Sequence, residues 1–274
     1  MSTIPPADAC SPEPSQIAAS SVYGPVVSWR AGRSLGVDLL LQTSICSFNC
    51  IYCQLGEIQQ KTRERAIYVE TARVERDFRH SDWREADIVT FSGSGEPTLA
   101  LNLAEVIRFV KEYSQKPVMV LTNGTMLHDP AVCADLKEAD IVSVKLDAAS
   151  EAVFQRMNRP VAGVSLAGVV EGAIALRQSY TGKLCLQCML MPGNLSEAEA
   201  MADIAARIQP DEIQLNTPKR PYPLSWTLES RGNHGESSVA SRALRTLTPQ
   251  EAADVAQMFR TRTRLPVSSV YREE

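Results

Sequence analysis

The sequence has few aromatic residues and no excess of positive charge. Phe, Trp and Tyr make up 6% of its 274 residues, and 28 Lys and Arg stand against 32 Asp and Glu, which gives a formal net charge of −4. Proteins that bind nucleic acid over much of their surface are strongly basic and use interleaved aromatic rings to stack bases. The composition therefore argues against whole-surface nucleic-acid binding, although it leaves room for a local basic groove.

Long apolar runs and a recognisable leader are also lacking. No apolar run reaches the roughly 20 residues that span a bilayer. The opening segment MSTIPPADACSPEPSQ has neither the basic nor the apolar region of a secretory signal. We therefore expect a cytoplasmic protein without membrane contact. In that reducing compartment, clustered cysteines more often bind metal or perform redox chemistry than form disulfides. The seven cysteines are Cys10, Cys46, Cys50, Cys53, Cys133, Cys185 and Cys188.

Short apolar runs alternate with helical patterns along most of the chain. The runs predict strands over residues 37–42, 87–92, 117–122, 141–147, 183–190 and 212–216. Several are apolar at consecutive positions, as is typical of parallel strands buried on both faces. Because helical patterns lie between them, the sequence predicts right-handed βαβ units and a parallel sheet. Six strands are fewer than a closed eight-stranded barrel needs, so an open barrel and a doubly wound sheet both fit the pattern.

Apolar residues at helical spacing predict helices over residues 103–113 and 166–174. Capping signals mark four helix starts: Asn102 with Glu105, Ser165, Ser196 with Glu199, and Thr248-Pro249 with Glu251.

The residues that are unusual for a core follow the predicted strands. Cysteines occupy 46–53, a glycine-rich segment occupies 93–97, and Asn123, Asp147 and Asn216 lie at the ends of three further strands. The carboxyl ends of parallel strands meet at one edge of a sheet or barrel, where ligands bind. The sequence therefore predicts one functional site at that edge.

The segment SICSFNCIYCQLG contains three cysteines within a stretch of eight residues, at Cys46, Cys50 and Cys53. A loop this short brings three thiolates to one soft metal centre. A 4Fe–4S cluster takes cysteine thiolates, and three ligands leave one iron open. Structural zinc requires a fourth protein ligand, and the three histidines show no paired spacing that supplies it. Structural zinc and plain buried thiols are the alternatives.

The spacing C-x3-C-x2-C, with Tyr52 before the last cysteine, resembles the signature of the radical S-adenosylmethionine (SAM) superfamily. The segment SGSGEP at residues 92–97 resembles the second motif of that superfamily. More narrowly, YGPVVSWRAGRSLGVDLL, CSFNCIYCQLG, FSGSGEPTL, LTNGTML, VKLDA, FQRMNRP and QLNTPKRPYP resemble, in that order, iron–sulfur oxidoreductases related to tRNA wybutosine-synthesising enzymes. The resemblance covers residues 23–223.

The resemblance implies an α/β fold, a partial (β/α)6 TIM barrel with an N-terminal arm and a C-terminal helical extension. We accordingly divide the chain into an arm at 1–22, a core barrel at 23–223 and an extension at 224–274 packed on the core. The resemblance also implies that SAM binds the open iron through its amino and carboxylate groups. One electron from the cluster would then give methionine and a 5′-deoxyadenosyl radical that abstracts a substrate hydrogen. A reductant such as ferredoxin or flavodoxin is the implied partner.

Roles for further residues follow from the resemblance and from strand position. Gly93, Ser94, Gly95, Glu96 and Pro97 are expected to hold the methionine amino group of SAM. Tyr52 is expected to meet the adenine, Asn123 and Asp147 the ribose hydroxyls, and Gln187 and Asn216 to point into the same mouth. The plainer alternatives are an Asn-Gly turn at Asn123 and a local cap at Asp147.

Lys145 lies two residues before Asp147, so both side chains face the same side of a strand. A lysine in a buried strand is costly unless it is paired. Lys145 is therefore expected to neutralise the SAM carboxylate or Asp147, or to act on the substrate; an ion pair that only holds the barrel together is the alternative.

The substrate is not specified by these motifs. Arg156, Asn158, Arg159, Lys219 and Arg220 are candidates for recognising an anionic substrate. RNA base modification, by analogy with the wybutosine relatives, competes with modification of a peptide or small molecule. The acidic net charge favours a peptide or small molecule. The wybutosine-synthesising enzymes are expected to hold a second cluster with an extra N-terminal cysteine set, whereas only Cys10 precedes the motif here. The chemistry of that second cluster, including pyruvate capture, is therefore not expected for this chain. A non-catalytic iron–sulfur electron-transfer or metal-binding protein is the alternative from another class.

The remaining clusters are weaker signals. Cys185 and Cys188 are three residues apart in a strand and so lie on opposite faces, which argues against a second cluster. The basic run 260–264 is interpreted as a solvated helix end.

Overall fold

The computed structural model describes residues 19–41, 43–231 and 239–271. Its main element is an eight-stranded sheet in the order β1-β2-β5-β6-β7-β8-β9-β12. The strands are β1 (Val22–Ser28), β2 (Gly32–Val37), β5 (Ile88–Phe91), β6 (Val118–Thr122), β7 (Ile141–Lys145), β8 (Lys183–Met189), β9 (Glu212–Asn216) and β12 (Val267–Ser269). All neighbouring pairs are parallel except the β1–β2 hairpin, which is antiparallel.

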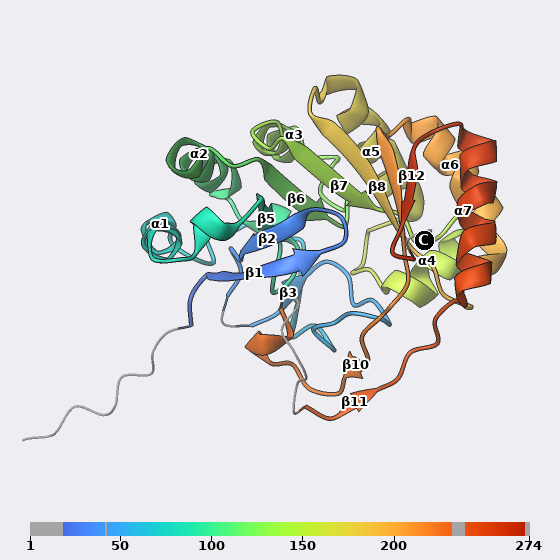
Figure 1. The fold of residues 1–274 in the computed structure, drawn as a ribbon, viewed down its shortest axis with the longest axis horizontal. Helices are drawn as coiled ribbons and strands as arrows, with labels where there is room; N and C mark the ends of the chain where they lie inside the picture. The colour runs from blue at the N-terminus through green and yellow to red at the C-terminus, as the bar shows by residue number, and fades with distance from the viewer. Residues whose placement is uncertain (1–18, 42, 232–238, 272–274) are drawn as a thin grey trace, which may run out of the picture.

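The strand order decides between the two fold alternatives. From β2 to β12, neighbours in the sheet follow one another in chain order, whereas a doubly wound sheet reverses its order at a switch point. Figure 1 shows the sheet curled, with the helices along its outer side. Because β1 and β12 form the two ends of this sheet, the barrel is open. The expected partial TIM barrel is therefore confirmed.

Seven α-helices are present in the described residues. They are α1 (Thr71–Arg79), α2 (Leu103–Ser114), α3 (Pro130–Leu136), α4 (Glu151–Asn158), α5 (Leu166–Ser179), α6 (Ala198–Ile208) and α7 (Pro249–Thr263). Short 3-10 turns lie at Trp83–Glu85, Pro97–Leu99, Leu195–Glu197 and Leu228–Ser230. Two small ribbons pair β3 (Ile45–Cys46) with β4 (Gln60–Lys61) and β10 (Tyr222–Pro223) with β11 (Ser241–Arg242). No helix of the described residues has the length and apolar character needed to cross a membrane.

Two of the four predicted helix caps are confirmed. Ser165 Oγ accepts from Gly168 N–H at the start of α5, and Thr248 forms a complete capping box with Glu251 at the start of α7. Asn102 precedes α2 as predicted, but its amide donates to Val69 O instead of capping the helix. The capping box expected there is therefore wrong.

The predicted start at Ser196 is also wrong, because α6 begins at Ala198 after a 3-10 turn. The Glu197 carboxylate next to it accepts from Ala149 N–H and Ser150 N–H instead of serving the helix. The helix therefore starts two residues after the predicted position, and Glu197 connects this start to the loop before α4.

The first predicted strand is displaced as well. The apolar run at 37–42 predicts a strand, but β2 ends at Val37 and the following leucines are buried in a loop. Leu40 N–H donates to Asp38 Oδ1 at 3.0 Å, a turn closed by the aspartate side chain, which ends the strand. Apolar content here reflects burial in the core and not strand geometry.

The end of the chain contributes to the sheet. β12 pairs in parallel with β9, with Val267 opposite Ile213, and α7 packs on α6. The proposed division at residues 22/23 and 223/224 stays a prediction, and residues 1–18 of the arm, with Cys10, lie outside the described residues.

Candidate active site

A cavity of about 610 Å³ opens at the carboxyl ends of the barrel strands. All three loop cysteines line it, together with Gly93, Gly95, Glu96, Asn123, Lys145, Gln187 and Asn216. The sequence expectation that the strand ends share one site therefore agrees with where these residues lie. Ser94, Pro97 and Asp147 are not part of the lining; they lie directly behind it.

The cysteine loop is fixed by main-chain hydrogen bonds to two other elements. Ile45 N–H donates to Ser94 O at 2.8 Å, and Glu96 N–H donates back to Ile45 O at 3.0 Å. On the other side, Ile51 N–H donates to Met157 O at 3.0 Å, near the end of α4. The loop is thus held between the glycine-rich segment and α4.

Cys50 is buried and Cys46 and Cys53 are half-buried, and burial raises the pKa of each thiol. For Cys53 the pKa rises to about 12, and for Cys46 it rises well above its usual value, with Glu96 adding to the effect. N–H groups approach two of the sulfurs: Asn123 Nδ2 lies 3.5 Å from Cys46 Sγ, and Asn158 Nδ2 lies 3.5 Å from Cys50 Sγ. Such donors stabilise a thiolate and tune a bound iron–sulfur centre.

The donor set fits a cluster better than a single ion. In residues 19–41, 43–231 and 239–271, no three Cys, His, Asp or Glu side chains converge as ligands of one metal ion. A tetrahedral zinc requires its sulfurs at one point, whereas in a 4Fe–4S cluster each thiolate binds a different iron. Three cysteines that line one cavity from one loop can each bind a different iron of such a cluster.

The glycine-rich segment makes the closest backbone contact of the site. Gly95 has φ +153°, and a Cβ added there would lie 1.7 Å from Ile45 O. Only glycine allows β3 to approach this closely. After it, Pro97 opens the 3-10 turn, and its peptide bond is not among the cis bonds of the described residues.

Glu96 is almost fully buried at the cavity wall. Its Oε1 accepts from Thr98 N–H, Thr98 Oγ1 and Thr122 Oγ1, and its Oε2 accepts from Asn123 N–H at 2.7 Å. Burial raises the pKa of Glu96 even though these hydrogen bonds oppose the shift. The carboxylate is therefore rigidly placed, with fewer donors on Oε2 than on Oε1.

Tyr52, Lys145, Asp147 and Asn158 form one buried polar cluster beside Cys50. The Tyr52 hydroxyl donates to Asp147 Oδ2, which also accepts from Asn158 Nδ2 at 2.7 Å. Lys145 Nζ lies 3.6 Å from the same oxygen and 5.2 Å from the centre of the Tyr52 ring. Burial lowers the pKa of Lys145, but Asp147, Cys50 and Cys53 outweigh it and the net shift is upward. The ammonium is therefore held charged beside the cysteines.

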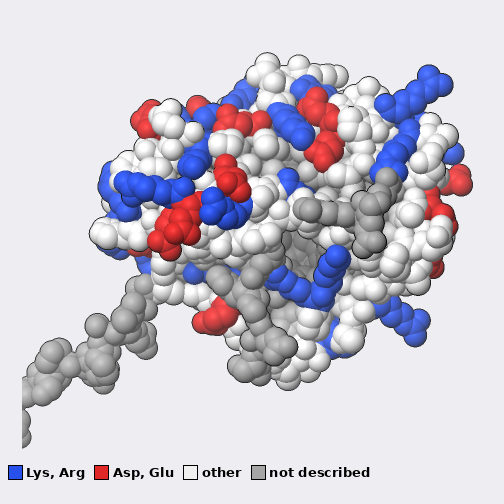
Figure 2. Space-filling view, in the orientation of Figure 1, with Lys and Arg blue, Asp and Glu red and all other residues white. Residues whose placement is uncertain are grey.

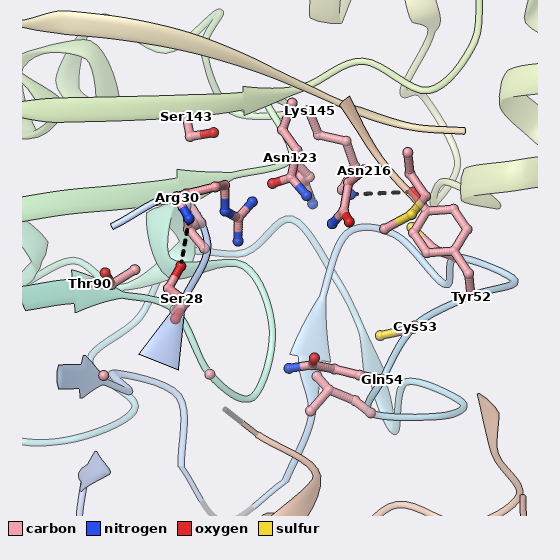
Figure 3. A pocket seen from close by; sticks show the side chains of 18 of the residues that line it. Ser28, Arg30, Tyr52, Cys53, Gln54, Thr90, Asn123, Ser143, Lys145 and Asn216 are labelled. Atoms are coloured by element: carbon pink, nitrogen blue, oxygen red, sulfur yellow. Dashed lines mark hydrogen bonds between the residues drawn. The ribbon is translucent and has the colours of Figure 1, made fainter. Parts of the chain in front are cut away.

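Figure 3 shows Asn123, Lys145 and Asn216, which lie at the carboxyl ends of β6, β7 and β9. Asn123 and Lys145 lie side by side in this view, with Asn216 between them and the cysteine loop. Asn216 Oδ1 accepts from Thr217 N–H, and Gln187 contributes to the lining from β8. Asp147, by contrast, has Oδ1 engaged by Met189 N–H and Oδ2 by the cluster described above. Contacts of these residues with a ligand stay predictions.

Sequence reasoning missed Asp38 and Arg231, which lie behind the glycine-rich segment. Asp38 Oδ2 accepts from Ser94 N–H, from Ser94 Oγ and from Arg231 Nη1 at 3.2 Å. Both side chains are buried. A lone aspartate after an apolar strand and an arginine 193 residues later carry no common sequence signal.

The candidates for anionic recognition separate into two groups. Lys219 and Arg220 line the cavity, and Arg220 Nη1 donates to Gln54 Oε1 at 3.2 Å. Arg156 instead donates to Gly193 O, and Asn158 belongs to the buried cluster. Cys188 lies in the main hydrophobic core, which Cys185 does not join.

Comparison with known proteins agrees with this geometry. Residues 40–205 match the Radical SAM superfamily. The chain is 46% identical over 223 residues to the UPF0026 protein slr1464 of Synechocystis sp., which covers 81% of this chain and 84% of that protein. Among solved structures, TYW1 with a lysine-pyruvate adduct bound is similar with a TM-score of 0.59 at 16% identity, covering 85% of this chain and 75% of that chain. Streptococcus suis SuiB bound to precursor peptide SuiA has the same TM-score at 12% identity, covering 83% and 47%.

Proposed function

Because the chain belongs to the radical SAM superfamily and is a radical SAM enzyme, we propose that Cys46, Cys50 and Cys53 hold a 4Fe–4S cluster at which SAM is reductively cleaved. The observation that carries the proposal is the set of three cysteines on one cavity wall, with the glycine-rich segment hydrogen-bonded to their loop. A cluster held there by these cysteines would supply the electron that cleaves SAM to methionine and a 5′-deoxyadenosyl radical, and the radical would abstract a substrate hydrogen. An external one-electron donor such as ferredoxin or flavodoxin supplies that electron.

The side chains of this protein position the reactants and balance charge. We propose that Glu96 accepts from the methionine ammonium of SAM, with Gly93, Ser94, Gly95 and Pro97 shaping the approach. Thiolate ligands and cluster are collectively negative, and the charged Lys145 ammonium lies beside them. Lys145 therefore acts through its charge, since a protonated amine paired with Asp147 is neither a base nor a nucleophile.

The remaining polar residues support this arrangement. Asn123 and Asn158 donate to two of the sulfurs and orient the loop. Gln187 on β8 and Asn216 on β9 line the cavity and offer hydrogen bonds to SAM or substrate. Tyr52 is proposed to meet the adenine through its backbone or ring, because its hydroxyl is engaged by Asp147. Asp147 then positions Tyr52, and contact with the ribose would require it to release one of its present donors.

A peptide or small-molecule substrate fits the surface better than RNA does. Figure 2 shows acidic and basic side chains interspersed on one face of the described residues, without a continuous basic surface. RNA binding through phosphate contacts is steeply salt-dependent. Substrate turnover that fell sharply between low and physiological salt would favour RNA instead.

The test uses anaerobically reconstituted, reduced protein incubated with SAM, with 5′-deoxyadenosine and bound iron as the two readouts. Replacement of Cys46, Cys50 or Cys53 by Ala is expected to abolish both. Cys133→Ala, a half-buried thiol on α3, is the matched control and is expected to change neither. Cysteine variants that retained iron and SAM cleavage would refute the proposal.

A further inference from the structure

Arg30 enters the cavity from the end of the barrel opposite the cysteine loop. It lies in the turn between β1 and β2, and β2 runs parallel to β5, so its start and its end lie at opposite ends of the barrel. The cysteine loop follows the end of β2. Arg30 nevertheless lines the same cavity, and Figure 3 shows it next to Ser28 with its guanidinium directed toward Asn123, on the far side of Asn123 from Cys53 in this view.

Strand register gives the depth of this position. Ser143 pairs with Cys185 of β8, whereas Lys145, two residues nearer the carboxyl end of β7, pairs with Gln187. Lys145 lies beside the cysteines, Lys219 and Arg220 also line the cavity, and Figure 3 shows Arg30 on the side of Ser143, which is two residues deeper along β7 than Lys145.

Arg30 has no counter-ion at this depth. Its Nη1 is buried without a hydrogen-bond partner, and no carboxylate of the described residues forms an ion pair with it. The guanidinium carbon lies 5.5 Å from the centre of the Trp29 ring. Ser143 Oγ, which also lines the cavity, is likewise buried without a partner in this part of the chain. Arg30 is half-buried, its guanidinium stays charged, and leaving its buried Nη1 without a hydrogen-bond partner is costly. The site therefore suits an anion that the described part of the chain does not provide.

We propose that Arg30 and Ser143 bind the carboxylate of a small carboxylic acid substrate at the floor of the cavity. This inference rests on the proposed function, because it places the rest of that molecule toward Lys145 and the cysteine loop. The planar fork of a guanidinium matches a carboxylate, and the hydroxyl adds one donor.

A carboxylate suits this floor better than the other available anions. One guanidinium balances one charge, whereas a phosphate monoester carries about −1.5 to −2 at neutral pH. The nearest cation above, Lys145, is already paired with Asp147. The carboxylate of SAM is expected at the open iron, at the other end of the cavity. A second, carboxylate-bearing molecule is therefore the occupant.

Ligand-observed NMR on the reconstituted holoprotein tests the proposal, with acetate, glycolate, acetamide and methyl phosphate as probes. The acids are expected to bind wild type at least tenfold more tightly than acetamide does, and Arg30→Gln is expected to weaken that binding at least tenfold. Arg33→Gln is the matched control, since Arg33 lies on the same hairpin but is exposed and paired with Asp87. It is expected to bind the acids as wild type does.

Three results would overturn the proposal: no binding of either acid to wild type, equal binding by Arg30→Gln, or tighter binding of methyl phosphate than of acetate. If Arg30→Gln fails to fold, Arg30→Lys and Ser143→Ala replace it, and both are expected to weaken acid binding. Iron content and 5′-deoxyadenosine formation are measured on the same wild-type sample. If the protein cleaves SAM but acid binding does not depend on Arg30, only this inference is refuted. If acid binding depends on Arg30 but the protein neither holds a cluster nor cleaves SAM, only the proposed function is refuted.

Discussion

Replacement of Asp38 by Asn should strongly destabilise the protein, because this carboxylate joins three segments. Its Oδ1 accepts from Leu40 N–H, and its Oδ2 accepts from Ser94 N–H, Ser94 Oγ and Arg231 Nη1. The side chain is 1% exposed and that of Arg231 is 7% exposed. An asparagine would turn its NH2 toward the single donor Leu40, because the other side faces three donors. The substitution thus removes one hydrogen bond and leaves Arg231 as a buried charge without its partner.

The size of the effect follows from these two losses. Removing one partner of a buried ion pair costs about 3–5 kcal/mol, and a lost backbone hydrogen bond adds about 1 kcal/mol. We therefore expect a loss of about 4–6 kcal/mol in the free energy of unfolding, measured by urea denaturation. In the Arg231→Met background the same substitution should cost at most about 1–2 kcal/mol, since it leaves no buried guanidinium without a partner and only the hydrogen bonds of Asp38 change.

The functional consequence is expected in the binding of SAM. Ser94 supports the segment that carries Glu96, so Asp38→Asn should raise the KM for SAM more than it lowers kcat. A destabilisation below about 1 kcal/mol, or an equal cost in both backgrounds, would refute the reasoning that Asp38 and Arg231 act as a coupled pair.

Three further predictions concern single positions. Gly95→Ala should abolish cluster retention, measured as bound iron, because the new Cβ would lie 1.7 Å from Ile45 O; a variant with normal iron content would contradict this. Thr248→Ala removes the capping box of α7 and should cost about 1 kcal/mol in thermal unfolding, with an unchanged melting temperature as the contrary result. Partial burial raises the pKa of Glu212, but hydrogen bonds, first that from Lys183, outweigh it and hold this pKa below its usual value. Because the pKa of Glu212 is lower in the folded than in the unfolded protein, its ionised carboxylate stabilises the folded protein at pH values above the unfolded-state pKa of about 4.3. This stabilisation is lost as the pH falls through the folded-state pKa. In the Glu212→Gln variant the free energy of unfolding should therefore fall less between neutral and acid pH than in wild type. The difference is expected to be under about 1 kcal/mol, because Lys183 is half exposed.

Local signals in the sequence were reliable where the local pattern alone decides the structure. The apolar stripe and Ser165 cap of α5 depend on residues close in sequence, and so does the capping box at Thr248. The convergence of the strand-end loops also followed, because parallel strands bring their carboxyl ends to one edge.

Features that depend on distant pairing were not accessible in this way. Leu39 to Leu41 look like a strand, yet the Asp38 side chain turns the chain out of the sheet. β12 joins the sheet only because β9 offers a free edge 51 residues earlier, from Val267 to Asn216. The unpaired Arg30 is invisible in sequence, since its isolation becomes apparent only when the surrounding strands are in place.

Tyr52 shows how a residue predicted to contact a ligand serves the structure as well. Its hydroxyl donates to the buried Asp147, so Tyr52→Phe removes a hydrogen bond to a charged acceptor, which typically contributes about 1.5–3 kcal/mol. Asp147 retains Asn158 and Met189 N–H as donors, which places the expected loss near the lower end of that range. The ring and backbone remain, so the KM for SAM should change less than twofold if they alone face the adenine. A KM raised tenfold with unchanged stability would instead mean that the hydroxyl leaves Asp147 to contact SAM.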